Sequence, residues 1–143
     1  MEDIKPKKAR NFRNYKVWQD AVDYASKVYK ITSEMPWFEK KGLCDQLQRA
    51  VVSISSNIAE GAAKPSDIEF AHFLDMSLGS AFEVETQLQI AKNVGYLRSN
   101  ANHNLNDNDK DKEKGDITYE ELLNDLQEIE KQLNGLISSL RQS

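Results

Sequence analysis

The residues best suited to chemistry form two polar lines on neighbouring predicted helices. On the helix that contains the stretch SISSNIAEG, polar side chains recur every three or four residues beside an apolar line, and a second polar line follows on the next predicted helix. Residues at that spacing share one face of a helix. If the two lines face each other, Arg49 comes within reach of Glu83. We define the predicted polar seam by these members: Gln46, Arg49, Ser53, Asn57, Glu60, Ser80, Glu83 and Gln87.

Two interpretations of the polar seam are open. Covered by a neighbouring helix or a second subunit, it would form a hydrogen-bonded network that fixes register and partner choice while adding little net stability. Left uncovered, it would be the solvated face that any surface helix has. Serine and asparagine are poor helix formers to place on a free surface. Lysine, the usual surface residue, is absent from residues 46–63. These two observations favour a covered seam.

Enzymatic and metal-binding patterns are missing from the sequence. The two histidines, His72 and His103, have no partners at the spacing of a zinc site. The Glu-x-x-His pattern of di-iron bundles occurs once, at Glu69 and His72, where two copies are needed. We find no glycine-rich phosphate loop, no paired catalytic carboxylates and no Ser/His/Asp arrangement. The sequence therefore predicts no enzyme, no cofactor and no metal centre.

The acidic segment DNDKDKEKGDITYEE resembles a calcium-binding EF-hand loop, but its register fails. With Gly115 at the sixth loop position, the first, third and fifth positions carry lysine instead of oxygen ligands. With Asp109 at the first position, the glycine arrives one residue late. A solvated acidic loop is the better interpretation.

Composition indicates one helical domain. The chain has 143 residues, with only 6 glycines and 3 prolines, and this length suits a single core. No apolar run approaches the roughly 20 residues of a membrane span, and the start MEDIKPKK has no apolar segment typical of a signal peptide. The single Cys44 excludes an intramolecular disulfide and fits a reducing compartment. We therefore expect a cytoplasmic protein in which Cys44 is a small buried residue.

Apolar periodicity predicts four helices. The first runs from about Asn14, as its N-cap, to Glu34, and the second from about Lys40 to Ala63. The third begins after Ser66, which forms a capping box with Glu69, and ends near Gly95. The fourth begins near residues 116–118. We predict an all-α fold, an antiparallel up-down-up-down four-helix bundle over residues 14–143, with a flexible basic arm at 1–13 and a disordered loop at about 98–116.

The fourth helix carries an apolar line that alternates spacings of three and four residues. Such a line is a seam for packing against other helices at shallow angles. The residues of the line are Leu122, Leu126, Ile129, Leu133, Leu136 and Leu140.

Basic residues gather at the beginning of a chain whose net charge is −4. A basic arm can attract the phosphate backbone of a nucleic acid, and the competing interpretation is a solvated, frayed terminus. The residues of this arm that could contact nucleic acid are Lys5, Lys7, Lys8, Arg10, Arg13 and Lys16.

The segments GLCDQLQRAVVSISSNIAEG, EFAHFLDMSLGSAFEVETQL and VGYL, with FRNYKVWQDA before them, resemble a known bacterial family. This is the four-helix-bundle family encoded by open reading frames in intervening sequences of 23S ribosomal RNA. The accessory variability proteins of diversity-generating retroelements are similar too. The resemblance covers roughly residues 12–97. It implies a bundle that assembles as a ring, often a homopentamer, without enzymatic activity.

Two functional hypotheses follow. The first is a non-catalytic homo-oligomeric scaffold, in which the polar seam lines a subunit interface and the partner is the chain itself. The alternative is an accessory protein that binds RNA or DNA, or a nucleic-acid enzyme, with the basic arm as the contact. Acids outnumber bases in residues 17–98, so the helical core offers no basic surface for this second role. Neither hypothesis involves a membrane.

Overall fold

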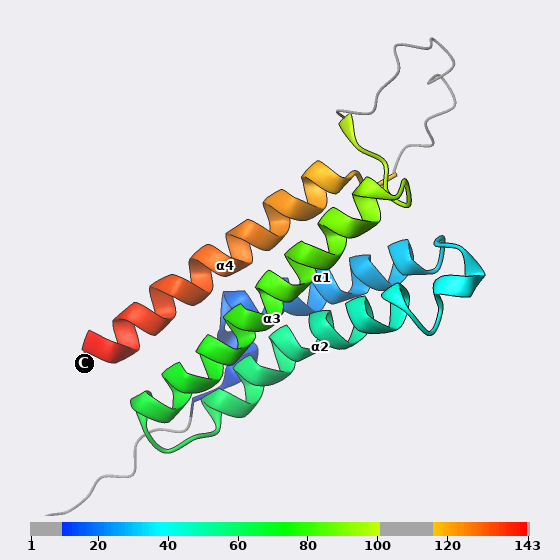
Figure 1. Cartoon of the computed structure of the whole chain (residues 1–143). Coiled ribbons are helices and arrows are strands. Elements are labelled where there is room, and N and C mark those ends of the chain that lie inside the picture. Colours follow the sequence, from blue (N-terminus) through cyan, green and yellow to red (C-terminus); the bar gives the residue numbers. More distant parts are fainter. Residues whose placement is uncertain (1–9, 101–115, 143) are drawn as a thin grey trace, which may run out of the picture.

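Four long helices, each running antiparallel to the one before it, make up the fold (Figure 1). The computed structural model describes residues 10–100 and 116–142. Within these residues every regular element is helical, which confirms the predicted all-α four-helix bundle. The long helices are α1 (Lys16–Thr32), α2 (Leu43–Ala62), α3 (Asp67–Asn93) and α4 (Tyr119–Gln142), and two short 3-10 helices are η1 (Phe12–Asn14) and η2 (Trp37–Glu39).

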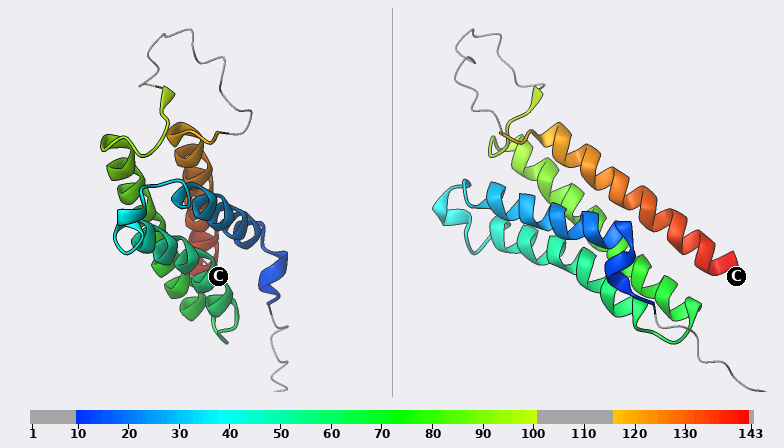
Figure 2. Two further views of the ribbon diagram at one scale, coloured as in Figure 1. Left: turned by 90° about the vertical axis from the view of Figure 1, so that its right-hand side faces the viewer. Right: turned by 180° about the vertical axis from the view of Figure 1, so that it is seen from behind.

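Consecutive helices are neighbours in space, and α4 returns beside α3 to close the bundle (Figure 2). The contact of α4 with α1 is tied by polar groups. The hydroxyl of Tyr24 donates to the carbonyl of Leu122 at 2.9 Å, and Lys27 pairs with Asp125 at 2.9 Å. Helices α1 and α3 therefore occupy diagonal corners of the bundle.

Capping residues explain where α3 begins and ends. The Ser66 hydroxyl accepts from the backbone N–H of Glu69 at 3.2 Å, as the capping box predicts. At the other end Gly95 adopts a φ of +86°, and the N–H of Tyr96 donates to the carbonyl of Ala91 at 2.8 Å. This is the Schellman arrangement, which favours glycine because other residues are strained at positive φ.

The predicted N-cap of α1 is wrong by one residue, and the predicted beginning of α2 is wrong by about three residues. Tyr15, not Asn14, is the N-cap of α1, and it makes no side-chain cap hydrogen bond, since Asn14 belongs to η1. Helix α2 begins at Leu43 rather than near Lys40, because Trp37–Glu39 form the separate turn η2.

The predicted apolar line of α4 is confirmed over its first three turns. After Leu133 the predicted positions rotate away from the core. Leu122, Leu126, Ile129 and Leu133 are buried, but the next buried position is Ile137, whereas Leu136 is only half-buried. A straight helix has 3.6 residues per turn, so a strict seven-residue repeat rotates away from the core by about 20° per heptad.

The two ends of the predicted 98–116 loop lie against each other. Arg98 pairs with Asp116 at 3.1 Å, and the N–H of Tyr119 donates to the carbonyl of Arg98 at 2.7 Å. The intervening residues 101–115, where the rejected calcium loop and His103 fall, lie outside the described residues.

The predicted flexible arm differs from the structure at residues 10–13. Phe12 packs on Trp18 of α1, with ring centroids 5.1 Å apart, and Arg10 contacts the turn between α2 and α3. The packed part of the chain therefore begins by Arg10. Residues 1–9 lie outside the described residues.

Gly61 lies at a close contact between α2 and α3 and yields the first prediction. A Cβ atom at Gly61 would lie 2.6 Å from Cβ of Phe73 and 2.9 Å from Cδ1 of Phe70. We expect Gly61→Ala to lower the free energy of unfolding by about 1–3 kcal/mol through overpacking, measured by urea denaturation. Gly135→Ala is the matched control, because nothing lies within 4 Å of its Cβ position, and it should stabilise α4 by up to about 1 kcal/mol. A Gly61→Ala variant as stable as the wild type would contradict this packing.

Candidate functional site

The centre of the predicted polar seam is assembled where α2 meets α3. Ser80 of α3 donates its hydroxyl hydrogen to the hydroxyl oxygen of Ser53 at 2.9 Å. The side-chain amide of Asn57 donates to the same hydroxyl at 2.9 Å and to the Ser53 carbonyl at 2.8 Å. Asn57 is buried and both serines are half-buried. Because these side chains are short, the two helices can approach closely. The side chains also satisfy one another's hydrogen-bonding groups.

Ser77 extends this contact into the core. Its fully buried hydroxyl donates to the carbonyl of Ile54 at 2.7 Å, which links α3 directly to the backbone of α2. Ser77 is not a member of the predicted polar seam. Its spacing of three residues before Ser80 is the signal that would have joined them.

The outer members of the polar seam are not drawn together. Gln46, Arg49, Glu60 and Glu83 are exposed. The Arg49 side chain is 79% exposed and pairs with Asp45 on its own helix at 3.0 Å, so the pairing with Glu83 considered from the sequence is absent. Four residues rotate a helix position by about 40° beyond a full turn. Ser53 lies four residues before Asn57, and Arg49 lies four residues before Ser53. Each step rotates the position further from the core, so Asn57 is buried and Arg49 faces solvent.

Gln87 is buried at the far end of the polar seam. Its side-chain amide donates to Glu83 at 3.4 Å, while its carbonyl oxygen is buried and has no hydrogen-bond partner. An unpartnered buried oxygen is unfavourable in a single chain.

The described residues of the basic arm are engaged with the bundle. Arg10 pairs with Asp67, donates to the carbonyl of Lys64 at 2.7 Å and is only 15% exposed. The guanidinium of Arg13 lies 4.5 Å from the ring centroid of Phe12, and Lys16 pairs with Asp20. Lys5, Lys7 and Lys8 lie outside the described residues. Arg10 therefore supports the local structure and is not available to a phosphate in this conformation.

A buried carboxyl group between α3 and α4 was missed by the sequence analysis. Glu130 is only 9% exposed, and its Oε2 has no hydrogen-bond partner. Burial and the neighbouring Glu85 carboxyl raise the pKa of Glu130 to about 7. Glu130 follows the buried Leu126 by four residues, which places it at the edge of the apolar line, and that position was the available signal.

The structure assembles no catalytic or metal centre from the residues that it describes. No group of three His, Cys, Asp or Glu side chains among them could hold a metal ion. His72 is exposed beside Phe73. Cys44 is buried, and burial raises the pKa of its thiol, which disfavours the reactive thiolate. None of the described helices is long and apolar enough to span a membrane.

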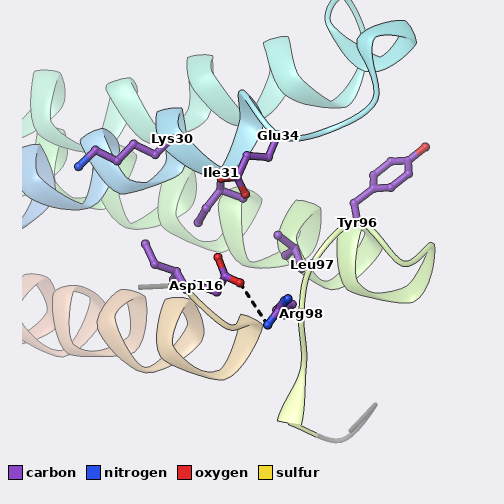
Figure 3. A pocket seen from close by; sticks show the side chains of 8 residues that line it. Lys30, Ile31, Glu34, Tyr96, Leu97, Arg98 and Asp116 are labelled. Carbon is purple, nitrogen blue, oxygen red and sulfur yellow. Dashed lines mark ion pairs between the residues drawn. The ribbon is translucent and has the colours of Figure 1, made fainter. Parts of the chain in front are cut away.

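A shallow cavity of about 340 Å³ lies where the segment after α3 meets the C-terminal end of α1 (Figure 3). Its charged lining consists of two basic and two acidic side chains, and one of each sign, Arg98 and Asp116, form an ion pair. This balanced lining does not select a charged ligand. The lining residues are Lys30, Ile31, Glu34, Tyr96, Leu97, Arg98, Asp116 and Ile117.

The outward surface of α3 is unusually apolar, and this is the main feature that the sequence analysis overlooked. Helix α3 has almost no amphipathic bias, because large apolar side chains lie on its outer side as well as on its core side. We call the outer set the α3 stripe. Its members fall within about a third of a turn around the helix axis. They are Ile68, Met76, Phe82, Ile90 and Val94, each at least 46% exposed.

Two exposed aromatic residues lie apart from the α3 stripe, at the turn η2 between α1 and α2. Trp37 is 85% exposed and Phe38 is 63% exposed, and their rings pack edge to face with centroids 6.3 Å apart. The turn that carries them lies at one end of the bundle, between α1 and α2 (Figure 1).

Comparison with known proteins adds a family and a fold. The sequence profile of the 23S rRNA-intervening sequence protein family matches residues 13–114. A crystal structure from Bacteroides thetaiotaomicron, described as a protein of unknown function from the S23 ribosomal protein family, is similar with a TM-score of 0.68 and 23% sequence identity. The similarity covers 85% of this chain and 95% of that one. At this identity it shows a shared fold alone. No curated protein matches the chain significantly.

Asn57 and Arg49 allow a matched test of the polar seam. Asn57→Ala removes two hydrogen bonds at a buried position, so we expect the free energy of unfolding to fall by about 1–2 kcal/mol. Arg49→Ala removes an exposed ion pair on one helix and should change it by less than about 0.5 kcal/mol. Equilibrium urea denaturation of both variants measures the difference, and equal effects would show that the centre of the polar seam has no special role.

Glu130 predicts a stability that falls as pH rises. Its folded-state pKa of about 7 lies above the ordinary value of 4.5, so its protonated form stabilises the fold fully below pH 4.5 and this contribution is lost as pH rises through 7. Over that window the folding equilibrium constant should fall by at most about tenfold per pH unit. Glu130→Gln should flatten this dependence and be more stable than the wild type at pH 8, measured by denaturation at several pH values. Glu128→Gln, at an exposed position, is the control.

Proposed function

This chain belongs to the 23S rRNA-intervening sequence protein family, and we propose that it is a non-catalytic scaffold built from several copies of itself. The copies form a closed ring, and the resemblance implies five. Neither comparison indicates a catalytic family, and no described constellation offers a nucleophile with its base. As a scaffold, the oligomer would hold several copies of the same binding surface in a fixed arrangement for a partner.

The α3 stripe is the observation that carries this proposal. A helix with large apolar residues on its outer as well as its core side is normally covered on both sides. In one chain α3 is covered mainly by α2 and α4, and its outer side leaves Met76, Phe82 and Ile90 about half exposed. Extended apolar patches on soluble proteins mark interaction sites. A second copy of the chain would remove this surface from water.

The polar seam supports assembly indirectly. Its buried centre, Ser53, Asn57 and Ser80, fixes α3 against α2. Of the exposed members, Glu83 lies on the same outer arc of α3 as the α3 stripe, and Arg49 lies on α2. In the assembly such charged groups would need partners or water at the interface.

We place the assembly in the cytoplasm, since Cys44 is a free buried thiol. The alternative function, nucleic-acid binding through the basic arm, loses Arg10 to its ion pair with Asp67. Nucleic-acid binding would then depend mainly on Lys5, Lys7 and Lys8. We therefore rank this function second. If it holds, the partner of the oligomer is a nucleic acid or a nucleic-acid enzyme.

Ile90 provides the direct test. Ile90→Asp puts a charge into the α3 stripe, and burial of an unpaired charge is strongly unfavourable. We expect wild-type protein to elute as an oligomer and Ile90→Asp as a single chain of 16.3 kDa in size-exclusion chromatography with light scattering. Asn134→Asp adds the same charge to the exposed face of α4 and should leave the assembly unchanged. Monomeric wild-type protein at micromolar concentration would refute the proposal.

A further inference from the structure

The η2 turn leaves two aromatic side chains in water although its base is fixed in the core. Met35 is buried, and the thiol of Cys44 donates to the Met35 sulfur at 3.8 Å. Trp37 and Phe38 follow directly after Pro36, and both are exposed. Aromatic side chains of this size normally contribute buried area in a core or an interface. A fixed turn that exposes two of them therefore offers an apolar surface that the bundle itself does not use.

The backbone of the turn is paired within the turn. The N–H of Glu39 donates to the carbonyl of Pro36 at 2.9 Å. The N–H of Lys40 donates to the carbonyl of Trp37 at 3.1 Å, and the N–H of Gly42 donates to the carbonyl of Glu39 at 2.9 Å. Unpaired backbone groups are unfavourable where water is scarce. This pairing makes it easier for the turn to enter a partly dehydrated environment.

The charges of the turn are separated. The carboxylate of Glu39 is folded back toward the start of α2, since its Oε1 lies 3.1 Å from the position of a Cβ atom at Gly42. Lys40 and Lys41 are exposed, and neither is ion-paired with a carboxylate in the part of the chain that the structure describes. Glu34, at the end of α1, lines the cavity shown in Figure 3. We define the aromatic tip as Trp37, Phe38, Lys40 and Lys41, an exposed set that is aromatic and cationic.

The chemistry of the aromatic tip favours a lipid surface as its partner. Tryptophan is enriched where a membrane meets water, and lysine is attracted to the anionic lipids of a cytoplasmic leaflet. The two rings meet edge to face at 77°, so they do not form the parallel platform on which successive bases of a nucleic acid stack. Trp37 is 85% exposed, as a projecting side chain is, and a projecting side chain suits a flat surface.

We propose that the aromatic tip is a membrane-surface contact, in which Trp37 and Phe38 enter the headgroup region of an anionic bilayer and Lys40 and Lys41 bind its phosphates. A surface contact needs no membrane span, and none of the described helices could form one. The contact belongs to the single chain and does not depend on the proposed scaffold. A cyclic oligomer would nevertheless present its equivalent tips at one level, and several tips on one membrane bind more tightly than one.

Co-sedimentation of the full chain with vesicles tests the contact. Wild-type protein should bind vesicles of phosphatidylcholine and phosphatidylserine in equal parts. It should bind pure phosphatidylcholine vesicles about tenfold more weakly, because the lysines lose their attraction. Trp37→Ala should weaken binding to the anionic vesicles at least about tenfold, because it removes apolar area that only the membrane would bury. Tyr29→Ala removes an exposed aromatic side chain from the side of α1 and is the matched control.

Fluorescence provides a second measurement, which reports on Trp37 itself. The two tryptophans of the chain are Trp18 and Trp37, so Trp18→Phe leaves Trp37 as the only emitter. Anionic vesicles should shift its emission to shorter wavelength, and lipids with brominated chains should quench it. The double variant Lys40→Ala and Lys41→Ala should bind anionic vesicles no better than the wild type binds neutral ones.

The outcomes decide between partners. Wild-type protein that does not sediment with anionic vesicles overturns the inference, and so does binding that Trp37→Ala leaves unchanged. Binding of single-stranded RNA that is lost in Trp37→Ala, without vesicle binding, would assign the aromatic tip to a nucleic acid and overturn it as well. Circular dichroism of each variant separates lost binding from lost folding. A monomeric wild type would refute the proposed scaffold and leave these results unaffected.

Discussion

The close approach of α2 to α3 is the constraint on which the rest of the structure depends. Gly61 leaves no space for a Cβ atom beside Phe70 and Phe73, and the hydroxyl of Ser77 reaches the backbone of Ile54. Small residues at a helix crossing bring the axes together, and each hydroxyl must then be satisfied across the contact, since water is excluded. This packing fixes the rotation of α3 about its own axis. That rotation in turn decides which of its apolar residues enter the core and which remain outside.

The remaining helices are held by a different balance. Helix α4 packs through a line of leucines and isoleucines. It nevertheless buries the carboxyl group of Glu130 beside Glu85. Burial and repulsion from the neighbouring carboxyl group raise the pKa of Glu130 to about 7. The contact of α4 with α1 is instead bridged at its surface by Lys27 and Asp125. The α2–α3 contact therefore rests on close packing and hydrogen bonds, whereas the α3–α4 contact contains a carboxyl group whose pKa is raised by burial.

Periodicity in the sequence predicted the fold because each helix carries an apolar line and its stop signals are local. Ser66 capped α3 as expected, since a capping box involves only four consecutive residues. The site was harder to predict. Arg49 shares a spacing with Ser53 but is turned to solvent by the helical drift, and Arg10 finds Asp67 across the fold, a pairing that no local pattern encodes. Sequence spacing identifies a face but cannot say how far that face rotates from the core.

Helix α3 departs from the usual pattern of a surface helix, because two polar residues join its buried apolar residues and several large apolar residues lie on its outer side. Toward its own bundle it buries the polar groups of Ser77 and Gln87, one of them without a full set of partners. Toward solvent it exposes Phe82, Ile90 and Met76. For an isolated chain, exchanging these two sets would improve both the core and the surface, because apolar groups favour burial and polar groups favour water. Covering the outer side of α3 with a second copy, as proposed above, would bury these apolar side chains.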